Sequence, residues 1–527
     1  MTVTPSEDDL TPAESQADLT EGDVTTDPPT APLKVLRYVG PGLIVAGSIV
    51  GSGELIATTK TGAEAGFTLL WLIILGCVVK VFVQVEFGRY AIISGKTTLM
   101  ALDEVPGPRF RGRGNWLVWY WVIMWFTSIG QLGGIVGSVG QALAIGAPIT
   151  KAGAAYNEIA DAQTLLQFEQ FALEKSAIRE QPLVPTTTDA EIESRWEAFR
   201  IQFGDVTTTS DAATWATVMA IVTSLILVNG RYGLIQSLST VLVGAFTLLT
   251  IVNLFLLQDQ PDFRVRFSEF ISGLRFSLPA ANGDARPIGT ALATFGIIGV
   301  GAAELVVYPY WLLEKGYGRF VGKNDGSSEW TTRAAGWMRV MRIDAWGAMA
   351  LYTFATVAFY LLGAAILHRV ELNPAKDNLV RTLAVMFVPV FSTWASSVFL
   401  FGAFAVLYST FFVANASHAR TFSDAMRVIG LIDDDAETRA KWISWLSGAF
   451  PILCLVIYLV FPEPAQLVLI SGIAQGIMLP MLAGAALYYR YQRCPPGLAP
   501  GNLWDIMLWL SAVAMLITGL WTVWTQF

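Results

Sequence analysis

A succession of long apolar segments constrains the fold of this chain more than any other feature. A helix needs about 20 consecutive, mostly apolar residues to span a bilayer, and segments of roughly that length recur from residue 38 onward. Only 14% of the residues are charged, whereas soluble domains contain about 25%. The sequence therefore predicts an all-α integral membrane protein with about eleven transmembrane helices. The predicted spans are 38–60, 68–93, 116–145, 213–229, 233–257, 288–313, 343–367, 383–414, 442–461, 465–489 and 503–525.

The polar segments divide the chain into regions. Residues 1–33 are rich in Asp, Glu, Thr and Pro, a composition that buries too little apolar surface to fold, so we predict a disordered cytoplasmic tail. Transmembrane helices 1–3 are expected within 34–145, and helices 4–10 within 213–490. Between them lies a polar insertion, 146–212, and residues 491–527 provide a loop and helix 11.

The insertion at 146–212 contains helix signals of its own. Thr188 and Glu191 have the spacing of a capping box. We expect a second helix from about Tyr156 to Arg179, and together the two helices would form an extracytoplasmic cap. The alternative is a flexible insertion with transient helix. Apolar residues at helical spacing follow the capping box: Ile192, Trp196, Phe199 and Phe203.

Basic residues predict the orientation of the chain in the membrane. With eleven spans, most of the Lys and Arg residues in short loops fall after the even-numbered spans, and therefore on one side. Cytoplasmic loops carry an excess of Lys and Arg. We therefore predict a multi-pass protein of the cell membrane with a cytoplasmic N-terminus and an extracytoplasmic C-terminus.

One short pattern, G-x-x-E-L-[IV], occurs at 51–56 and again at 301–306, about 250 residues later. Both copies lie in the middle of a predicted span, as a duplication would leave them. An interrupted helix persists at membrane depth only where it lines a cavity or is buried in protein. A charge at the bilayer centre costs roughly 2.5–3.5 kcal/mol on insertion scales. These features favour a binding site in which freed backbone carbonyls and two carboxylates hold a hard cation.

The residues assigned to this metal or substrate site are Gly51, Glu54, Ala302 and Glu304. In the alternative interpretation, the small residues only permit close helix packing, and the carboxylates cap helices or form ion pairs. One carboxylate would otherwise hold a coupling proton if burial keeps it protonated.

Other polar residues within the spans carry weaker signals. Glu86 and Arg89 have the spacing of a structural ion pair within one helix, and Lys80 lies on the same predicted helix. Several further side chains either line a pathway or form hydrogen bonds between helices. These pathway candidates are Ser52, Gln131, Tyr408, Ser409 and Gln475.

Enzymatic chemistry has little support in this sequence. The chain has three cysteines without a C-x-x-C pair, and two histidines, which disfavours a zinc centre. It lacks G-x-S-x-G, P-loop and H-E-x-x-H motifs. We expect no enzyme activity, no cofactor and no nucleic-acid partner, with a metal ion or small solute and the lipid bilayer as partners.

The first span resembles a known family. GPG at 40–42, GSGE at 51–54, GAEAGF at 62–67 and LLW at 69–71 are similar to the first-span signature of the Nramp divalent metal transporters. That signature reads GPG…DPGN…GA…GY/F…LLW, and the GA at 301–302 is similar to the start of the sixth-span motif GAxxMPH. The resemblance implies a LeuT-type fold, in which two inverted five-helix repeats contain broken helices 1 and 6.

The departures from the family pattern concern the metal ligands. The metal-binding Asp of the family falls on Gly51, and its Asn falls on Glu54. Its carbonyl-donating Ala is kept as Ala302, whereas its methionine ligand falls on Leu305. The thioether of methionine suits softer transition metals. Its loss at Leu305, together with the carboxylates of Glu54 and Glu304, indicates a harder ion. The acidic residues that the family uses in its third span fall near Gln131, so proton coupling does not carry over.

These observations predict a secondary transporter that moves a divalent cation of the Mg²⁺ or Mn²⁺ class by alternating access, with the substrate held at the breaks of helices 1 and 6. Two alternatives remain open. One is a transporter of the same fold for a small organic solute, since fold does not fix function. The other is a membrane receptor without transport activity, which the insertion at 146–212 motivates. The coupling ion, the transport direction and the oligomeric state are left open.

Overall fold

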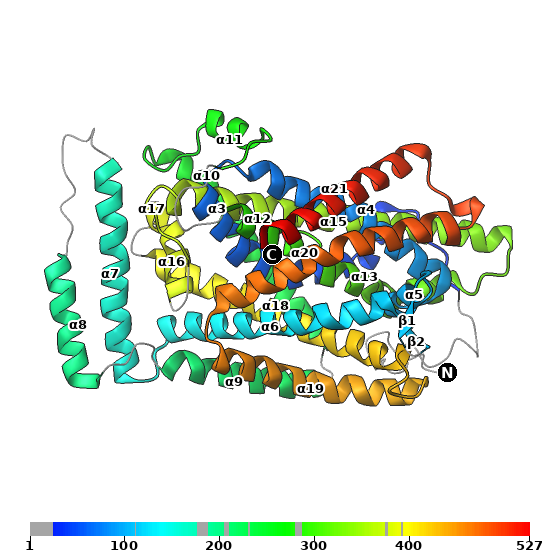
Figure 1. Cartoon of the computed structure of the whole chain (residues 1–527), viewed down its shortest axis with the longest axis horizontal. Coiled ribbons are helices and arrows are strands. Elements are labelled where there is room, and N and C mark those ends of the chain that lie inside the picture. Colours follow the sequence, from blue (N-terminus) through cyan, green and yellow to red (C-terminus); the bar gives the residue numbers. More distant parts are fainter. Residues whose placement is uncertain are drawn as a thin grey trace.

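The computed structural model describes residues 25–110, 112–175, 188–204, 210–229, 232–279, 287–374, 378–391 and 394–526. Figure 1 shows long helices packed side by side in a bundle, with helices α7 and α8 set across one end of it. Ten helices in this described part are long and apolar enough to cross a membrane. Helix α10 (Tyr232–Leu256) occupies the position of the fifth predicted span. The prediction of about eleven spans therefore agrees with the structure.

The bundle consists of the following elements in chain order. They are α2, η1 and α3 (Pro41–Ile49, Val50–Thr58, Thr59–Ala65), α4 (Leu70–Ser94), α6 (Trp116–Gly146), α9 (Ser210–Val228), α10, α12 and α13 (Pro287–Ile297, Ala302–Glu314), α15 and η3 (Ser328–Leu362, Gly363–Leu367), α18 (Ala395–Val428), α19 (Ala436–Val460), α20 and η7 (Pro464–Tyr488, Tyr489–Arg493) and α21 (Asn502–Gln526).

Short elements connect these spans. They are α1 (Pro32–Tyr38), α5 (Thr98–Asp103), α7 (Lys151–Lys175), α8 (Asp189–Phe203), η2 (Leu257–Asp259), α11 (Phe267–Gly273), α14 (Tyr317–Val321), α16 (Leu379–Ala384), η5 (Val385–Phe387), α17 (Val388–Phe391) and η8 (Pro496–Leu498). Strand β1 (Arg109–Phe110) pairs antiparallel with β2 (Arg113–Asn115) between the second and third spans.

Two predicted spans have boundaries that differ from the structure by more than two helical turns. The seventh span was expected to begin at residue 343, but α15 begins at Ser328, because a helix continues into polar residues that a hydropathy pattern does not include. The eighth was expected over 383–414. Its first part instead forms short helices such as α16 and α17, and α18 runs from Ala395 to Val428.

Polar side chains determine where several spans begin. Asn115 accepts a hydrogen bond from the backbone of α6, Ser327 from that of α15, and Asp435 from that of α19. A side chain at the N-cap satisfies one of the backbone N–H groups that a helix start leaves unpaired.

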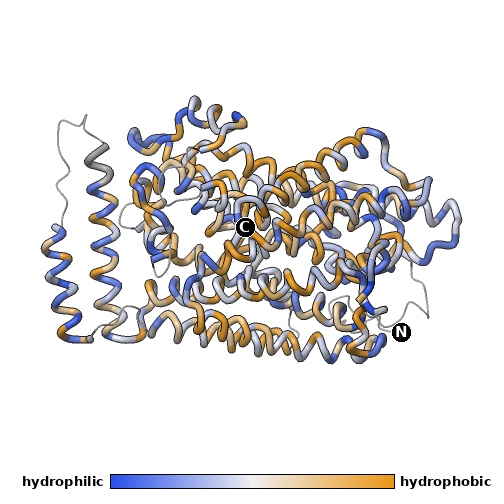
Figure 2. The backbone as a smooth tube through the Cα atoms, viewed as in Figure 1, coloured by the Kyte–Doolittle hydropathy of each residue, from blue (hydrophilic) through white to orange (hydrophobic). Residues whose placement is uncertain are grey.

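The surface of the bundle is apolar where a bilayer would surround it. Figure 2 shows hydrophobic residues along the bundle helices and hydrophilic residues concentrated at its two ends and on α7 and α8. Large apolar side chains point outward from several spans; Phe354 is 68% exposed and Phe401 is 69% exposed. Exposed apolar surface on this scale marks a membrane or partner interface, so the chain is an integral membrane protein.

Helices α12 and α20 approach each other through glycine. A Cβ atom on Gly472 would press against the backbone carbonyl of Ala293, and one on Gly296 would press against the backbone carbonyl of Gly472. Small residues at such contacts let helix backbones pack closely in membranes. This packing holds the first half of the interrupted sixth span in place.

Substitution of Gly472 by alanine is expected to lower the free energy of unfolding by about 1–3 kcal/mol, the usual cost of overpacking a tight contact. The matched control is Gly484→Ala on the same helix, where a Cβ atom meets nothing within 4 Å. Thermal unfolding of both purified variants in detergent provides the comparison. Equal unfolding temperatures would show that this contact relaxes freely.

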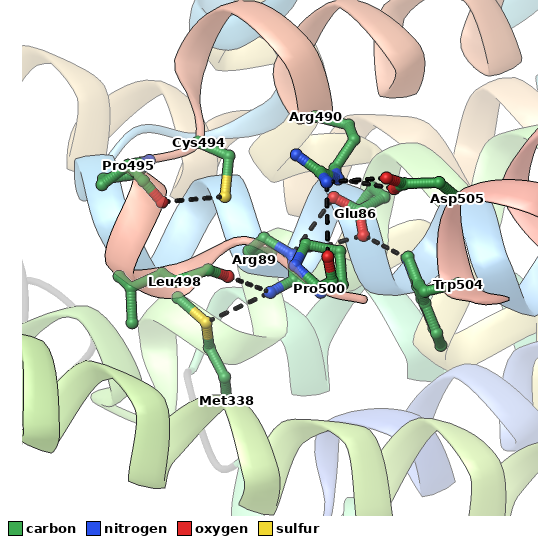
Figure 3. A network of polar contacts seen from close by, with 10 residues as sticks. All are labelled: Glu86, Arg89, Met338, Arg490, Cys494, Pro495, Leu498, Pro500, Trp504 and Asp505. Atoms are coloured by element: carbon green, nitrogen blue, oxygen red, sulfur yellow. Dashed lines mark hydrogen bonds and ion pairs between the residues drawn. The ribbon is translucent and has the colours of Figure 1, made fainter. Parts of the chain in front are cut away.

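A buried polar network ties the last span to the second (Figure 3). Arg89 donates to Glu86 with an Nε–Oε2 distance of 3.1 Å, which confirms the ion pair expected within this helix. Glu86 Oε1 also accepts from Trp504 Nε1 at 2.6 Å. Arg490 at the end of the tenth span pairs with Asp505 on α21 at 2.7 Å. Helix α21 is thus fixed to the bundle by charged groups as well as by packing.

The described parts of the N-terminal tail (1–33) and of the insertion (146–212) form defined contacts, with the rest of the chain or within the region itself. Within the predicted tail, Thr26 donates its backbone N–H to Phe320 O at 3.0 Å and accepts from Trp337 Nε1 at 2.8 Å. Residues 25–28 therefore pack against the bundle, since Pro28 also lies against Gly336 of α15. Residues 1–24 lie outside the described part, and disorder there stays a prediction.

The insertion contains the two helices that the sequence indicates. Thr188 caps α8 by accepting from Glu191 N at 3.3 Å. Ile192 and Phe199 are buried against α7 in a small separate core with Ile159 and Leu166. Helix α7 begins at Lys151, five residues before its predicted start, and the predicted segment beyond Lys175 lies outside the described residues.

Candidate functional site

The first and sixth spans carry the two copies of the G-x-x-E-L-[IV] pattern. The α-helical hydrogen bonding of each is interrupted, in two different ways. In the first span, α2 passes into the π-helical segment η1, which continues as α3 without a gap. In the sixth, α12 ends at Ile297 and α13 begins at Ala302. Gly299 in this gap has φ +57°, a left-handed conformation that glycine adopts at little cost. We call residues 298–301 the α12–α13 gap.

Helix α18 satisfies part of the backbone that η1 leaves unpaired. Gly51 N donates to Thr410 Oγ1 at 3.0 Å, and Thr410 Oγ1 donates to Gly47 O at 3.2 Å. A Cβ atom at Gly51 would lie 2.6 Å from Thr410 Oγ1. Gly51 therefore permits a close helix contact, and its own contribution to a site is limited to its backbone.

Glu54 lies on η1 and points at the α12–α13 gap. Its Oε1 accepts from Thr356 Oγ1 at 3.0 Å and from Gly299 N at 3.3 Å, and the residue is fully buried. Its Oε2 has no hydrogen-bond partner among the described residues. A buried polar atom without a partner is costly and requires an explanation, of which a bound ligand is one.

Glu304 borders the same gap from the other side. It lies in the first turn of α13, where the helix dipole favours negative charge. Its Oε2 is 2.6 Å from the position that a Cβ atom on Gly301 would take. The charges of Glu54 and Glu304 are close enough to repel each other. The structure thus brings the two predicted carboxylates to one interruption.

Lys80 was not among the predicted site residues, yet it reaches the same gap from α4. Its Nζ donates to Phe295 O and to Ile298 O, each at 2.6 Å, and the side chain is fully buried. It interacts electrostatically with both Glu54 and Glu304. The sequence contains a signal for this role, because Lys80 is a lone lysine in the middle of an apolar span. A charge within the membrane is costly, so such a residue is a candidate for function.

A chain of polar side chains connects the two interrupted spans. Gln131 Nε2 on α6 donates to Ser52 Oγ at 2.9 Å, and Gln475 Nε2 on α20 donates to Gln131 Oε1 at 3.0 Å. Gln475 Oε1 then accepts from Ala303 N at 3.0 Å. Three predicted pathway residues, Ser52, Gln131 and Gln475, therefore meet at the site.

The remaining predicted residues lie elsewhere or are covered. Tyr408 Oη accepts from Thr223 Oγ1 on α9 at 3.3 Å, apart from the carboxylates. Ser409 is buried beside α2, and its Oγ lies 3.7 Å from the position that a Cβ atom on Gly47 would take. Ala302 and Leu305 are fully buried at the start of α13, and Leu305 offers no ligand atom.

The donor set is rich in oxygen and poor in classical metal ligands. Among the described residues, no three His, Cys, Asp or Glu side chains gather as a metal-binding group. The groups at the gap are the two carboxylates, the Gln475 amide, backbone carbonyls and the Lys80 ammonium. Cys77, one turn before Lys80, also borders it, with Sγ 3.5 Å from the position that a Cβ atom on Gly299 would take. Oxygen donors of this kind suit hard cations.

Interrupted helices that bring buried charges to the middle of a membrane bundle are the architecture of secondary transporters. The chain belongs to the natural resistance-associated macrophage protein-like (Nramp) family, whose model matches residues 188–525. The family is one of transporters, so family membership confirms the prediction that this chain is not an enzyme.

Curated relatives match over shorter segments. The divalent metal cation transporter MntH of Caldanaerobacter subterraneus subsp. tengcongensis is 28% identical over 86 residues, 16% of this chain and 20% of the relative. The metal transporter Nramp2 of Arabidopsis thaliana is 31% identical over 94 residues, 18% of this chain and 17% of the relative. The matched segments thus span about a fifth of these relatives.

Solved structures match over almost the whole chain. A mutant form of the manganese transporter of Eremococcus coleocola superposes with a TM-score of 0.58 at 14% identity, covering 97% of this chain and 91% of that one. At this identity the match shows the fold. The predicted all-α, LeuT-type architecture is thereby confirmed.

Proposed function

We propose that this protein is a secondary transporter of a divalent metal cation, held between the interrupted first and sixth spans. The observation that carries the proposal is Glu54 Oε2, a buried carboxylate oxygen without a partner in the described part of the chain, at a gap that Glu304 also borders. The names of the relatives, a divalent metal cation transporter and a metal transporter, support the same class of substrate.

The charge balance favours an ion over a neutral solute. Two carboxylates and the Lys80 ammonium give the gap a net charge of −1 when all three are ionised. A divalent cation at the Glu54 side would neutralise the one carboxylate that Lys80 leaves uncompensated and bring the net charge of the gap to +1. The position of the methionine ligand of the family holds Leu305, so we propose a hard ion of the Mg²⁺ or Mn²⁺ class. Magnesium dehydrates reluctantly and would enter with several waters.

The same balance favours a second candidate, a small organic cation. Its single positive charge would match the net charge of the gap, with Glu54 as the anchor. Calorimetric titration of the purified protein in detergent separates the two. Our proposal predicts saturable one-site binding of Mg²⁺ or Mn²⁺, retained in Cys77→Ser because the ligands are oxygen atoms. An absence of binding by Mg²⁺, Mn²⁺ and Ca²⁺ would contradict it and favour the organic cation.

Gly301 provides a test of the site that leaves its charges in place. Alanine is expected to reduce metal uptake strongly while the protein stays folded. Gly301 has φ −66° and ψ 174°, which alanine adopts without strain. The new methyl group would point at Glu304 Oε2 and Gln475 Oε1, 2.6 and 3.0 Å away. Uptake into proteoliposomes by this variant, compared with Gly484→Ala, is the measurement; equal rates would place the substrate elsewhere.

The orientation remains part of the proposal, and loop contacts support it. Arg493, after the tenth span, pairs with Glu104, after the second, at 3.5 Å. Arg113, also after the second span, donates to Gly430 O after the eighth at 3.2 Å. Thr26 reaches Phe320 after the sixth. These loops therefore share one end of the bundle, and their basic residues support our proposal that this end is cytoplasmic.

A further inference from the structure

The broken sixth span exposes the negative end of a helix inside the membrane. The last carbonyl groups of any helix lack partners within that helix, and the helix dipole makes them attractive to cations. In transporters with broken helices, half-helix C-terminal ends coordinate Na⁺ or H⁺. Helix α12 ends in this way at Ile297, beside the α12–α13 gap.

In this protein a side chain occupies that end. Lys80 Nζ donates at 2.6 Å to Phe295 O, in the last turn of α12, and at 2.6 Å to Ile298 O, just beyond it. The same nitrogen lies 5.0 Å from the centre of the Phe295 ring, within the range of a cation–π contact. The two carbonyls and the aromatic ring contact one cationic group, and the carboxylates of Glu54 and Glu304 attract it electrostatically.

We propose that Lys80 is a covalently attached substitute for a bound monovalent cation at the C-terminal end of α12. Its ammonium satisfies the two carbonyls and neutralises one of the two carboxylates at the gap. Because the charge belongs to the chain, no free Na⁺ or K⁺ is required at this position. The inference goes beyond the proposed substrate, since it concerns the end of α12 whatever solute the protein carries.

Removal of the side chain should convert this place into a site for a free cation. Lys80→Ala opens space beside carbonyls that no longer have a donor, so Na⁺ or methylammonium should bind there and stabilise the fold by mass action. Lys80→Met keeps the volume of the side chain without its charge. It should be destabilised as well, but it has no room for a rescuing cation.

The experiment measures the unfolding temperature in detergent, with Na⁺, methylammonium or choline as the added cation. We expect Lys80→Ala to show a saturable rise with Na⁺ or methylammonium and none with choline. The matched control is Lys60→Ala, which removes another buried lysine, one that donates to Asn373 Oδ1 at 2.7 Å and pairs with Glu64 at 2.9 Å. No cation should rescue that variant selectively.

Two outcomes would overturn the inference, and neither depends on metal transport. The first is a Lys80→Ala protein that folds but responds equally to Na⁺, methylammonium and choline. The second concerns the wild type and applies even if the alanine variant fails to fold. A saturable, Na⁺-specific or K⁺-specific rise in the unfolding temperature of the wild type would show that a free cation still binds beside Lys80; indifference to these cations is the expected result.

Discussion

Replacement of Glu54 by glutamine is expected to reduce metal uptake by at least about 100-fold, since loss of even an outer-shell partner of a metal site costs about 10- to 100-fold in affinity. Glutamine keeps the shape of the side chain and an oxygen that can accept from Thr356 and Gly299, so the fold should persist. It removes the negative charge and the unpaired Oε2. Glu304→Gln should also reduce metal uptake, because Glu304 borders the same gap.

The measurement is the initial rate of uptake into proteoliposomes that contain equal amounts of folded protein. Glu437→Gln is the control for the substitution itself, because this side chain is 79% exposed at the start of α19. Uptake at the wild-type rate in both Glu54→Gln and Glu304→Gln would mean that the carboxylates serve packing and capping alone. A loss in Glu54→Gln only would restrict the site to the first span.

The second large effect is expected at Glu86, a buried carboxylate in the network shown in Figure 3. Glu86→Ala should lower the free energy of unfolding by about 3–5 kcal/mol, the cost of removing one partner of a buried ion pair. Arg89 would keep its charge while buried, and Trp504 would lose the acceptor that now lies 2.6 Å from its Nε1. Unfolding in detergent by heat or denaturant gives the measurement.

Two further variants identify the cause. Glu437→Ala breaks an exposed pair with Lys441 and should leave the stability of the protein nearly unchanged. The double variant Glu86→Leu/Arg89→Met replaces the buried pair by apolar side chains and should be more stable than Glu86→Ala. A Glu86→Ala protein as stable as the exposed control would show that water reaches Arg89.

The fold was largely predictable because bilayer thickness imposes a length on every apolar helix. The spans, the capping of α8 by Thr188 and the buried face of Ile192 and Phe199 all follow from local patterns. The errors lie where a helix continues past its apolar part, as α15 does from Ser328, or where an apolar run folds into several pieces, as residues 379–391 do. Hydropathy does not distinguish these cases.

The candidate site was predictable where a residue type is costly in a membrane. Glu54 and Glu304 were recognisable as charges within apolar spans, and Gln131 and Gln475 as buried amides. The roles of Thr356 and Thr410 depend on which helices become neighbours, which one sequence does not show. Tyr408, Ser409 and Thr410 carry the same signal in the sequence, but successive residues of a helix point about 100° apart, and Thr410 accepts from Gly51 N of η1.

The most direct test of the central claim is uptake by the purified protein in proteoliposomes, with Mg²⁺, Mn²⁺ and Ca²⁺ compared side by side while internal pH is monitored. The proposal predicts saturable flux of Mg²⁺ or Mn²⁺ that is lost in Glu54→Gln, and the pH trace will show whether protons accompany the ion. An absence of flux for all three ions, with folded protein in the membrane, would contradict divalent cation transport by this chain.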